Sequence, residues 1–101
     1  MKSTQLKDGE LIPINIAAHK LFGSERNELI HLCFKPGETL DKHKNPFDVI
    51  FYVLEGNGTL EVDDLSFSVG ADTVIEVSAS EMRGWTNTGS TDLRILVIKV
   101  L

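Results

Sequence analysis

Few side chains in this sequence could act as nucleophiles or as acids and bases near neutral pH. They are a single cysteine, Cys33, and three histidines, His19, His31 and His43. Cys33 lies in the apolar stretch 29–34 with only His31 close to it in sequence, so we expect a buried, unreactive thiol. A histidine among hydrophobic residues is more often a hydrogen-bonded core residue than a ligand, and we expect this of His31.

Composition and net charge limit the classes of protein to which this chain could belong. The chain has 101 residues, 42% of them hydrophobic, and a net charge of −5. These values predict a single domain spanning residues 1–101 and argue against disorder. The absence of a basic cluster disfavours nucleic acid as a partner, and no apolar run is long enough for a membrane helix. One cysteine and an N-terminus without an apolar signal region predict a cytoplasmic protein.

The elements that would position these residues are short strands. Turn-forming Gly and Asp residues recur along the chain between runs rich in β-branched and aromatic residues, which is typical of a sandwich or barrel. Apolar residues alternate on both sides of the Asp63–Asp64 turn, at Leu60, Val62, Leu65, Phe67 and Val69. This pattern predicts a hairpin with one buried face. Residues 15–22 could form a short helix, with Asn15 as N-cap, or an edge strand.

Two further strands are apolar on both faces. Residues 49–54 (VIFYVL) and 93–101 (LRILVIKVL) carry hydrophobic side chains at odd and even positions alike. A small antiparallel sheet with one solvated face would not show this pattern. Either a second sheet of the same chain or another subunit must cover the outer side, and we expect a homodimer.

Two stretches of the sequence resemble the motifs of the cupin family. Residues 37–56 (GETLDKHKNPFDVIFYVLEG) resemble the first cupin motif, and residues 70–87 resemble the second, which ends here in Gly84, Trp85, Thr86 and Asn87. The resemblance implies an all-β, jelly-roll β-barrel, the double-stranded β-helix of small single-domain cupins.

The same resemblance implies where a metal would bind. Metal-binding cupins use two histidines and a glutamate from the first motif and one histidine from the second. Those positions correspond here to His43, Asn45, Val49 and either Met82 or Arg83. Only His43 is a good ligand for a transition metal, because an amide oxygen binds weakly and valine has no donor atom. We therefore expect no metal cofactor; a bound metal would require His43, Asn45 and Asp48, with Asp48 turned inward by a bulge.

A barrel with apolar walls and a few polar groups is a common small-molecule site. The residues expected to line its mouth are His43, Asn45, Phe51, Met82, Arg83 and Trp85. If Arg83 points inward, its guanidinium suits a small organic anion such as a carboxylate or phosphate. If Met82 points inward instead, the pocket is apolar. The alternative is that these residues only close the end of the barrel, with Trp85 capping the core and its indole N–H hydrogen-bonded.

Three functional hypotheses follow. The first is a metal-independent cupin that binds a small ligand, or serves as a structural or sensing module, as a homodimer. The second is a metal-dependent enzyme of dioxygenase, isomerase or decarboxylase type, using His43 with Asn45, Asp48 or Glu81. The third is a metal-free enzyme in which His43 acts as a general base beside Asp41 and Arg83 binds an anionic substrate.

Overall fold

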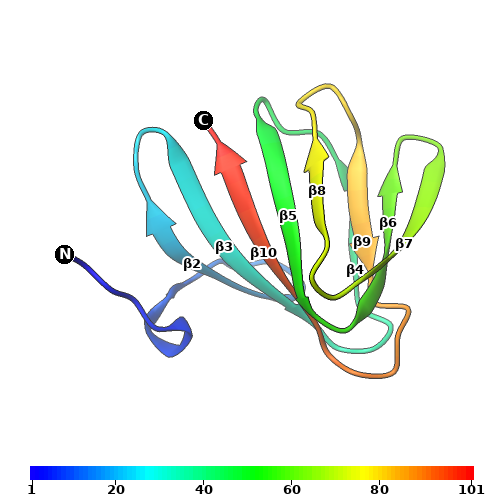
Figure 1. The fold of residues 1–101 in the computed structure, drawn as a ribbon, viewed down its shortest axis with the longest axis horizontal. Helices are drawn as coiled ribbons and strands as arrows, with labels where there is room; N and C mark the ends of the chain where they lie inside the picture. Colours follow the sequence, from blue (N-terminus) through cyan, green and yellow to red (C-terminus); the bar gives the residue numbers. More distant parts are fainter.

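The predicted strands form two antiparallel sheets that pack face to face (Figure 1). The computed structural model describes all residues, 1–101. The larger sheet has the order β1-β2-β3-β10-β5-β8 and the smaller one β4-β9-β6-β7. In chain order the strands are β1 (Glu10–Leu11), β2 (Ala17–Gly23), β3 (Asn27–Phe34), β4 (Thr39–His43), β5 (Asp48–Glu55), β6 (Asn57–Val62), β7 (Leu65–Gly70), β8 (Val74–Val77), β9 (Arg83–Thr86) and β10 (Leu93–Val100).

The core lies between the two sheets, as expected for the jelly-roll barrel. Fifteen buried hydrophobic residues form it. They include Phe51 of β5 and Trp85 of β9, whose rings meet edge to face with 5.4 Å between their centroids. Chain reversals at the end of this core are tight: Gly56 has a φ of +86°, and a Cβ at this position would clash with the carbonyl of Asp92. The only helical element, the 3₁₀ helix η1 (Leu6–Asp8), is too short to span a membrane.

The hairpin predicted around Asp63–Asp64 is present as β6 and β7, with Val62 paired to Leu65 across the turn. Asp63 adopts the left-handed conformation with a φ of 51°, which aspartate tolerates better than most residues. The prediction of one buried face is only partly correct. Leu65 and Phe67 are 63% and 46% exposed. They lie on the last strand of the smaller sheet, and the four-residue β8 at the edge of the opposite sheet does not cover them.

Residues 15–22 do not form a helix, so that alternative is wrong. Ala17–Gly23 is strand β2, which pairs antiparallel with β3 from Ala17 opposite Cys33 to Gly23 opposite Glu28. Pairing along a neighbouring strand has overridden the local N-cap and C-cap signals.

The two doubly apolar segments are the adjacent strands β5 and β10. Their inner side chains pack against the smaller sheet, which accounts for one apolar face. The outer face carries Ile50, Tyr52, Leu96 and Ile98, which stay partly exposed, and Leu54, which is 37% exposed. A second sheet of the same chain therefore explains half of the pattern and leaves the outer face without a partner.

Candidate ligand-binding site

A cavity of about 210 Å³ opens at one end of the barrel, between β4 and β9 of the smaller sheet and β3, β5 and β10 of the larger one. Its walls are mostly apolar. The polar side chains among its lining are His43, Asn45, Arg83 and Lys99, and none of the lining residues is acidic. His43, Asn45, Phe51, Arg83 and Trp85 had been expected around a pocket, and the structure brings all of them to this cavity.

Strand β9 decides the choice between Met82 and Arg83. Arg83 and Trp85 are two residues apart, share the inner face of the strand and are each 1% exposed. Met82 precedes the strand and does not line the cavity, so its inclusion among the pocket residues was wrong. The backbone fixes this register, because Met82 and Asp63 exchange hydrogen bonds: Met82 N–H donates to the Asp63 carboxylate at 3.0 Å and Asp63 N–H donates to the Met82 carbonyl at 2.8 Å.

Gly84 lies between the two inward side chains and allows β4 to pass close by. A Cβ at this position would lie 2.7 Å from the Leu40 carbonyl oxygen and 2.8 Å from the Lys42 nitrogen, both in β4. The pairing of β4 with β9 shifts register at this point, so that His43 stands opposite Arg83. The glycine therefore permits the irregularity that brings the polar groups of β4 and β9 together.

The Arg83 guanidinium is buried without a carboxylate partner. Nη1 donates to the Glu81 backbone carbonyl at 3.2 Å. Nη2 donates to the side-chain oxygen of Asn45, in the amide orientation that also lets Asn45 donate to the Lys44 carbonyl at 3.2 Å. None of the four ion pairs in the chain includes Arg83. Burial lowers the pKa of Arg83, and the charge of Glu81 opposes this shift. An arginine side chain nevertheless stays protonated in proteins, so the cavity contains an unneutralised positive charge.

Asn87 shows how this fold treats a buried polar residue that has a structural role. It is also 1% exposed. Its amide nitrogen donates to the carbonyls of Phe34 and Thr91 at 2.9 and 2.8 Å, and its oxygen accepts from Gly89 N–H at 2.9 Å. Asn87 is thus satisfied within the chain, whereas Arg83 has five N–H donors and uses them only in part.

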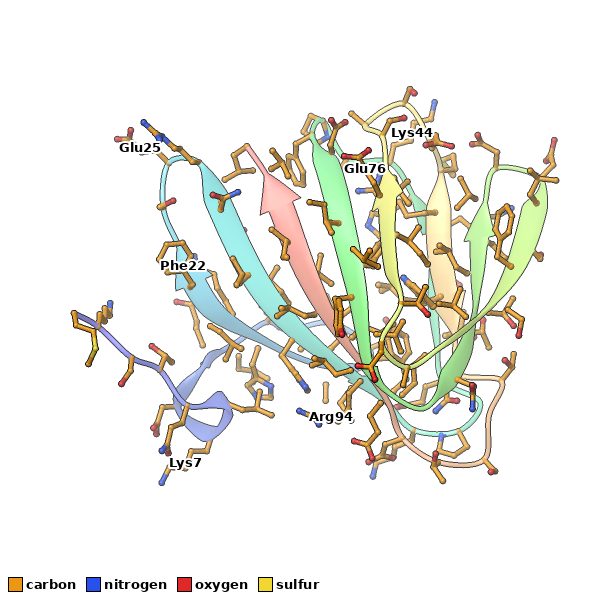
Figure 2. All side chains as sticks on the ribbon, in the orientation of Figure 1. Lys7, Phe22, Glu25, Lys44, Glu76 and Arg94 are labelled. Carbon is orange, nitrogen blue, oxygen red and sulfur yellow. The ribbon has the colours of Figure 1, made fainter.

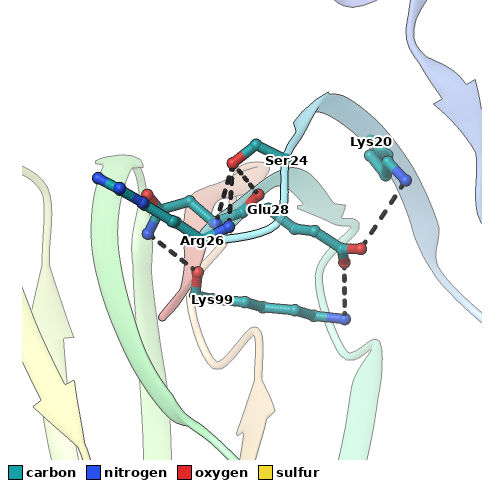
Figure 3. A network of polar contacts seen from close by, with 6 residues as sticks. Lys20, Ser24, Arg26, Glu28 and Lys99 are labelled. Atoms are coloured by element: carbon teal, nitrogen blue, oxygen red, sulfur yellow. Dashed lines mark hydrogen bonds and ion pairs between the residues drawn. The ribbon is translucent and has the colours of Figure 1, made fainter. Parts of the chain in front are cut away.

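Lys99 is the other permanent cation at the cavity, and its charge is compensated. Glu28 pairs with Lys99 at 3.4 Å and with Lys20 at 3.8 Å (Figure 3). The Lys99 ammonium also lies 5.4 Å from the centre of the Phe47 ring. The sequence-based list of pocket residues omitted Lys99. Lys99 is two residues from the buried Val97 on β10, and this spacing could have predicted that Lys99 lies on the inner face.

Trp85 adds a second donor without a partner. Its Nε1 is the only buried side-chain nitrogen or oxygen in the chain that has no hydrogen-bond partner. The expectation that the indole N–H finds a partner within the core was therefore wrong. The ring edge carrying Cε3 faces Gly58 of β6, which turns the Nε1 edge away from that strand. A buried donor without an acceptor costs about 1–3 kcal/mol, a cost that a ligand oxygen would remove.

The residues at this site do not fit a transition metal. His43 is exposed and its Nδ1 lies 3.1 Å from the backbone carbonyl of Asp41 rather than from that residue's carboxylate. The Asn45 oxygen is directed at Arg83, whose charge opposes a cation in the same place. Asp48 does not line the cavity and accepts a hydrogen bond from Ala79 N–H at 2.9 Å. No group of three or more His, Cys, Asp or Glu side chains in the chain could hold a metal ion.

The remaining chemistry-bearing residues lie outside the cavity. His31 is 4% exposed and accepts a hydrogen bond from Arg94 Nε at 3.1 Å, so it is a satisfied buried histidine as expected. Burial and the charges of Arg94 and His19 lower the pKa of His31 and favour its neutral form. Cys33 is only partly buried, so the expectation of a buried thiol was wrong. Desolvation nevertheless raises the pKa of Cys33, which disfavours the reactive thiolate.

Comparison with known proteins agrees with the fold. The family model for the cupin domain matches residues 30–99, which include both motif regions. The chain therefore belongs to the cupin family.

Three known proteins are similar to this chain in sequence or in fold. Auxin-binding protein 1 of Arabidopsis thaliana is 28% identical over 94 residues, which cover 84% of this chain but only 48% of that protein, so the chain spans about half the length of this relative. The polyketide cyclase RemF of Streptomyces resistomycificus has a TM-score of 0.86 at 22% identity, over 99% of this chain and 79% of RemF. KdgF of Halomonas sp. has a TM-score of 0.85 at 13% identity, over 100% of this chain and 94% of KdgF. The two structures share the fold.

Proposed function

We propose that this cupin binds a small organic anion in its barrel cavity without a metal ion. The observation that carries the proposal is the Arg83 guanidinium, buried at the cavity wall with no carboxylate to neutralise it. Arginine is suited to this role because its planar fork donates two parallel hydrogen bonds to a carboxylate. The anion would take the place beside His43 where metal-binding cupins hold their cation.

The size and walls of the cavity narrow the class of ligand. An apolar cavity of about 150 Å³ can hold benzene, so the 210 Å³ found here suits a body of comparable size with one anionic group. The Nε1 of Trp85 is buried and has no acceptor in the chain, so it would donate to an oxygen of that group once neighbouring side chains shift to admit it. A small carboxylate with a flat apolar body, such as benzoate, fits these requirements. The name of auxin-binding protein 1 states that this relative binds a small molecule, which supports a ligand-binding role in this fold.

Benzoate and its uncharged analogue benzamide provide the test. Titration calorimetry in a buffer containing a chelator compares the wild type, Arg83→Met and the matched control Arg94→Met. Arg94 lies outside the cavity and pairs with Glu55 at 3.3 Å. We expect wild type and Arg94→Met to bind benzoate in preference to benzamide, and Arg83→Met to lose that preference. Equal binding of the two compounds by the wild type would contradict an anion site.

Elemental analysis separates this proposal from the metal-dependent alternative. The purified protein is expected to contain no stoichiometric metal and to show no thermal shift with Fe²⁺, Mn²⁺ or Zn²⁺. A stoichiometric metal that disappears in His43→Ala would instead establish a metal-dependent cupin, with Asn45 as the next ligand to examine.

We also propose that the protein is a homodimer in the cytoplasm. The partly exposed outer face of β5 and β10, with Ile50, Tyr52, Leu96 and Ile98, is apolar enough to pack against a second copy. Sedimentation velocity is expected to show a dimer for the wild type and a monomer for Leu54→Asp, a change at the exposed rim of this face. A wild-type monomer at high concentration would contradict the proposal.

A further inference from the structure

A second hollow lies where the two sheets fail to close, between β7 and β8. It is a groove of about 440 Å³. β7 and β8 are the last strands of their sheets, so each has an edge of backbone N–H and C=O groups that no strand of this chain pairs. The groove lining comprises Leu60, Val62, Asp63, Leu65, Phe67, Ser68, Val69, Gly70, Thr73, Ile75, Glu76, Val77 and Glu81.

Two exposed apolar residues of the groove, Leu65 and Phe67, point toward the inside of the sandwich. Phe67 pairs with the buried Leu60, and Leu65 pairs with Val62, so each faces the same side as its inward partner. Both are nevertheless largely exposed, as described above. Leu65 and Phe67 are exposed because no strand of the opposite sheet covers them.

The edge of β7 also lacks the features that usually prevent association. Its sequence, LSFSVG, contains no lysine, no proline and no charged residue. Natural proteins protect free edges with such residues, and an uncharged apolar edge is a template for pairing with another strand. A partner strand added here would satisfy the backbone and direct alternate side chains into the groove.

The charge of the groove indicates which kind of strand fits. Asp63, Glu76 and Glu81 line it, and no Lys, Arg or His does. The Asp63 and Glu81 carboxylates accept backbone hydrogen bonds and keep their charge, whereas Glu76 pairs with Ile50 and therefore directs its side chain to the outer face of the larger sheet. A second copy placed groove to groove is disfavoured as the occupant, because two such grooves would oppose their carboxylates.

We propose that the β7 edge binds an extended segment of a partner protein, four to six residues long, with alternating apolar side chains and flanking lysine or arginine residues. The length follows from β8 and β7, which have four and six residues. The basic residues would lie beside the groove carboxylates. This site is separate from the barrel cavity, so its failure would leave the anion proposal intact.

Three blocked synthetic peptides test the proposal by calorimetry and NMR. The first has valine alternating with threonine at its centre and lysine at both ends; the second has glutamate at both ends. The third equals the first but has N-methyl groups along the edge that would pair. We expect the lysine peptide to bind at least about tenfold more tightly than either of the others. Equal binding of all three, or no binding of the lysine peptide at about millimolar concentration, would overturn the proposal.

Protein variants locate the binding on the molecule. Phe67→Ser should weaken binding of the lysine peptide at least about fivefold, because the substitution removes apolar contact area from the groove. Phe22→Ser is the matched control, since Phe22 is 50% exposed on β2, away from the groove (Figure 2). Glu81→Gln should weaken binding of the lysine peptide, because it removes a charge from the groove and keeps a side-chain oxygen that accepts from Ser78 N–H. Equal loss in Phe67→Ser and Phe22→Ser, or a dimer of the wild type that Phe67→Ser abolishes, would contradict a partner strand on β7.

Discussion

The two hollows of this cupin have similar apolar walls and opposite charge. The barrel cavity is lined by Arg83, Lys99 and His43 with no acidic residue, whereas the β7–β8 groove is lined by the acidic residues Asp63 and Glu81 with no basic residue. The cavity encloses its charge, with Arg83 1% exposed, while the groove exposes Leu65 and unpaired strand edges. This difference in charge is why we propose a small anion as the ligand of the cavity and a basic strand as the partner of the groove.

The largest expected effect tests the charge of the cavity. Arg83→Met should weaken benzoate binding by about thirtyfold or more, because losing one partner of a buried charge pair costs about 2–5 kcal/mol. Calorimetry at pH 7 measures this change. A loss smaller than about threefold would show that Arg83 does not hold the anion.

A carboxylate introduced into the cavity should give it a negative charge, as in the groove. Asn45→Asp places a negative charge against the Arg83 guanidinium, which Asn45 already contacts. The new ion pair would occupy the donors that the ligand requires, so we expect benzoate binding to weaken about tenfold and the unliganded protein to melt at a higher temperature. The matched variant Asn45→Ala should weaken binding less. Unchanged benzoate affinity in Asn45→Asp would argue that the ligand lies elsewhere.

The orphaned donor of Trp85 should have a smaller effect. Trp85→Phe removes Nε1 and keeps an aromatic ring against Phe51. We expect benzoate affinity to fall about threefold to tenfold, the range for one hydrogen bond to a ligand. Benzamide, which lacks the charge, should lose less. If both compounds lose affinity equally, the change reflects packing and not the N–H donor.

The smallest expected effect is that of ionic strength, which should change ligand binding at the two hollows to different extents. Exposed charges are screened by salt and buried ones much less, since the Debye length falls from about 10 Å at 0.1 M to about 3 Å at 1 M. Raising the sodium chloride concentration across that range should weaken binding of the lysine peptide about threefold or more. It should weaken binding of benzoate less than about twofold. The reverse order would contradict the assignment of a buried and an exposed site.

Most of the fold could be predicted from the sequence because its signals are local. Alternation at Leu60 and Val62 fixed the β6 strand, and the Asp63–Asp64 pair fixed its turn. The exposure of Phe67 could not be predicted, because it depends on where β8, on the opposite sheet, ends. The helix alternative for residues 15–22 failed for a related reason, since pairing with β3 decided that segment.

The candidate site was predictable in its residue types and only partly in its geometry. The cupin-like motif indicated His43, Asn45 and Trp85, and the cavity contains all three. The choice between Met82 and Arg83 depended on a one-residue register, which the reciprocal hydrogen bonds with Asp63 determine. The lack of a carboxylate partner for Arg83 and of any hydrogen-bond partner for Trp85 Nε1 is a property of three-dimensional packing that no local pattern contains.

A crystal structure of the protein grown with both benzoate and a mixture of Mn²⁺, Fe²⁺ and Zn²⁺ tests the central claim most directly. The account predicts a carboxylate within hydrogen-bond distance of the Arg83 guanidinium, close to Trp85 Nε1, and no anomalous metal peak beside His43. A metal ion coordinated by His43 and two or more further side chains, with Arg83 turned out of the cavity, would contradict it.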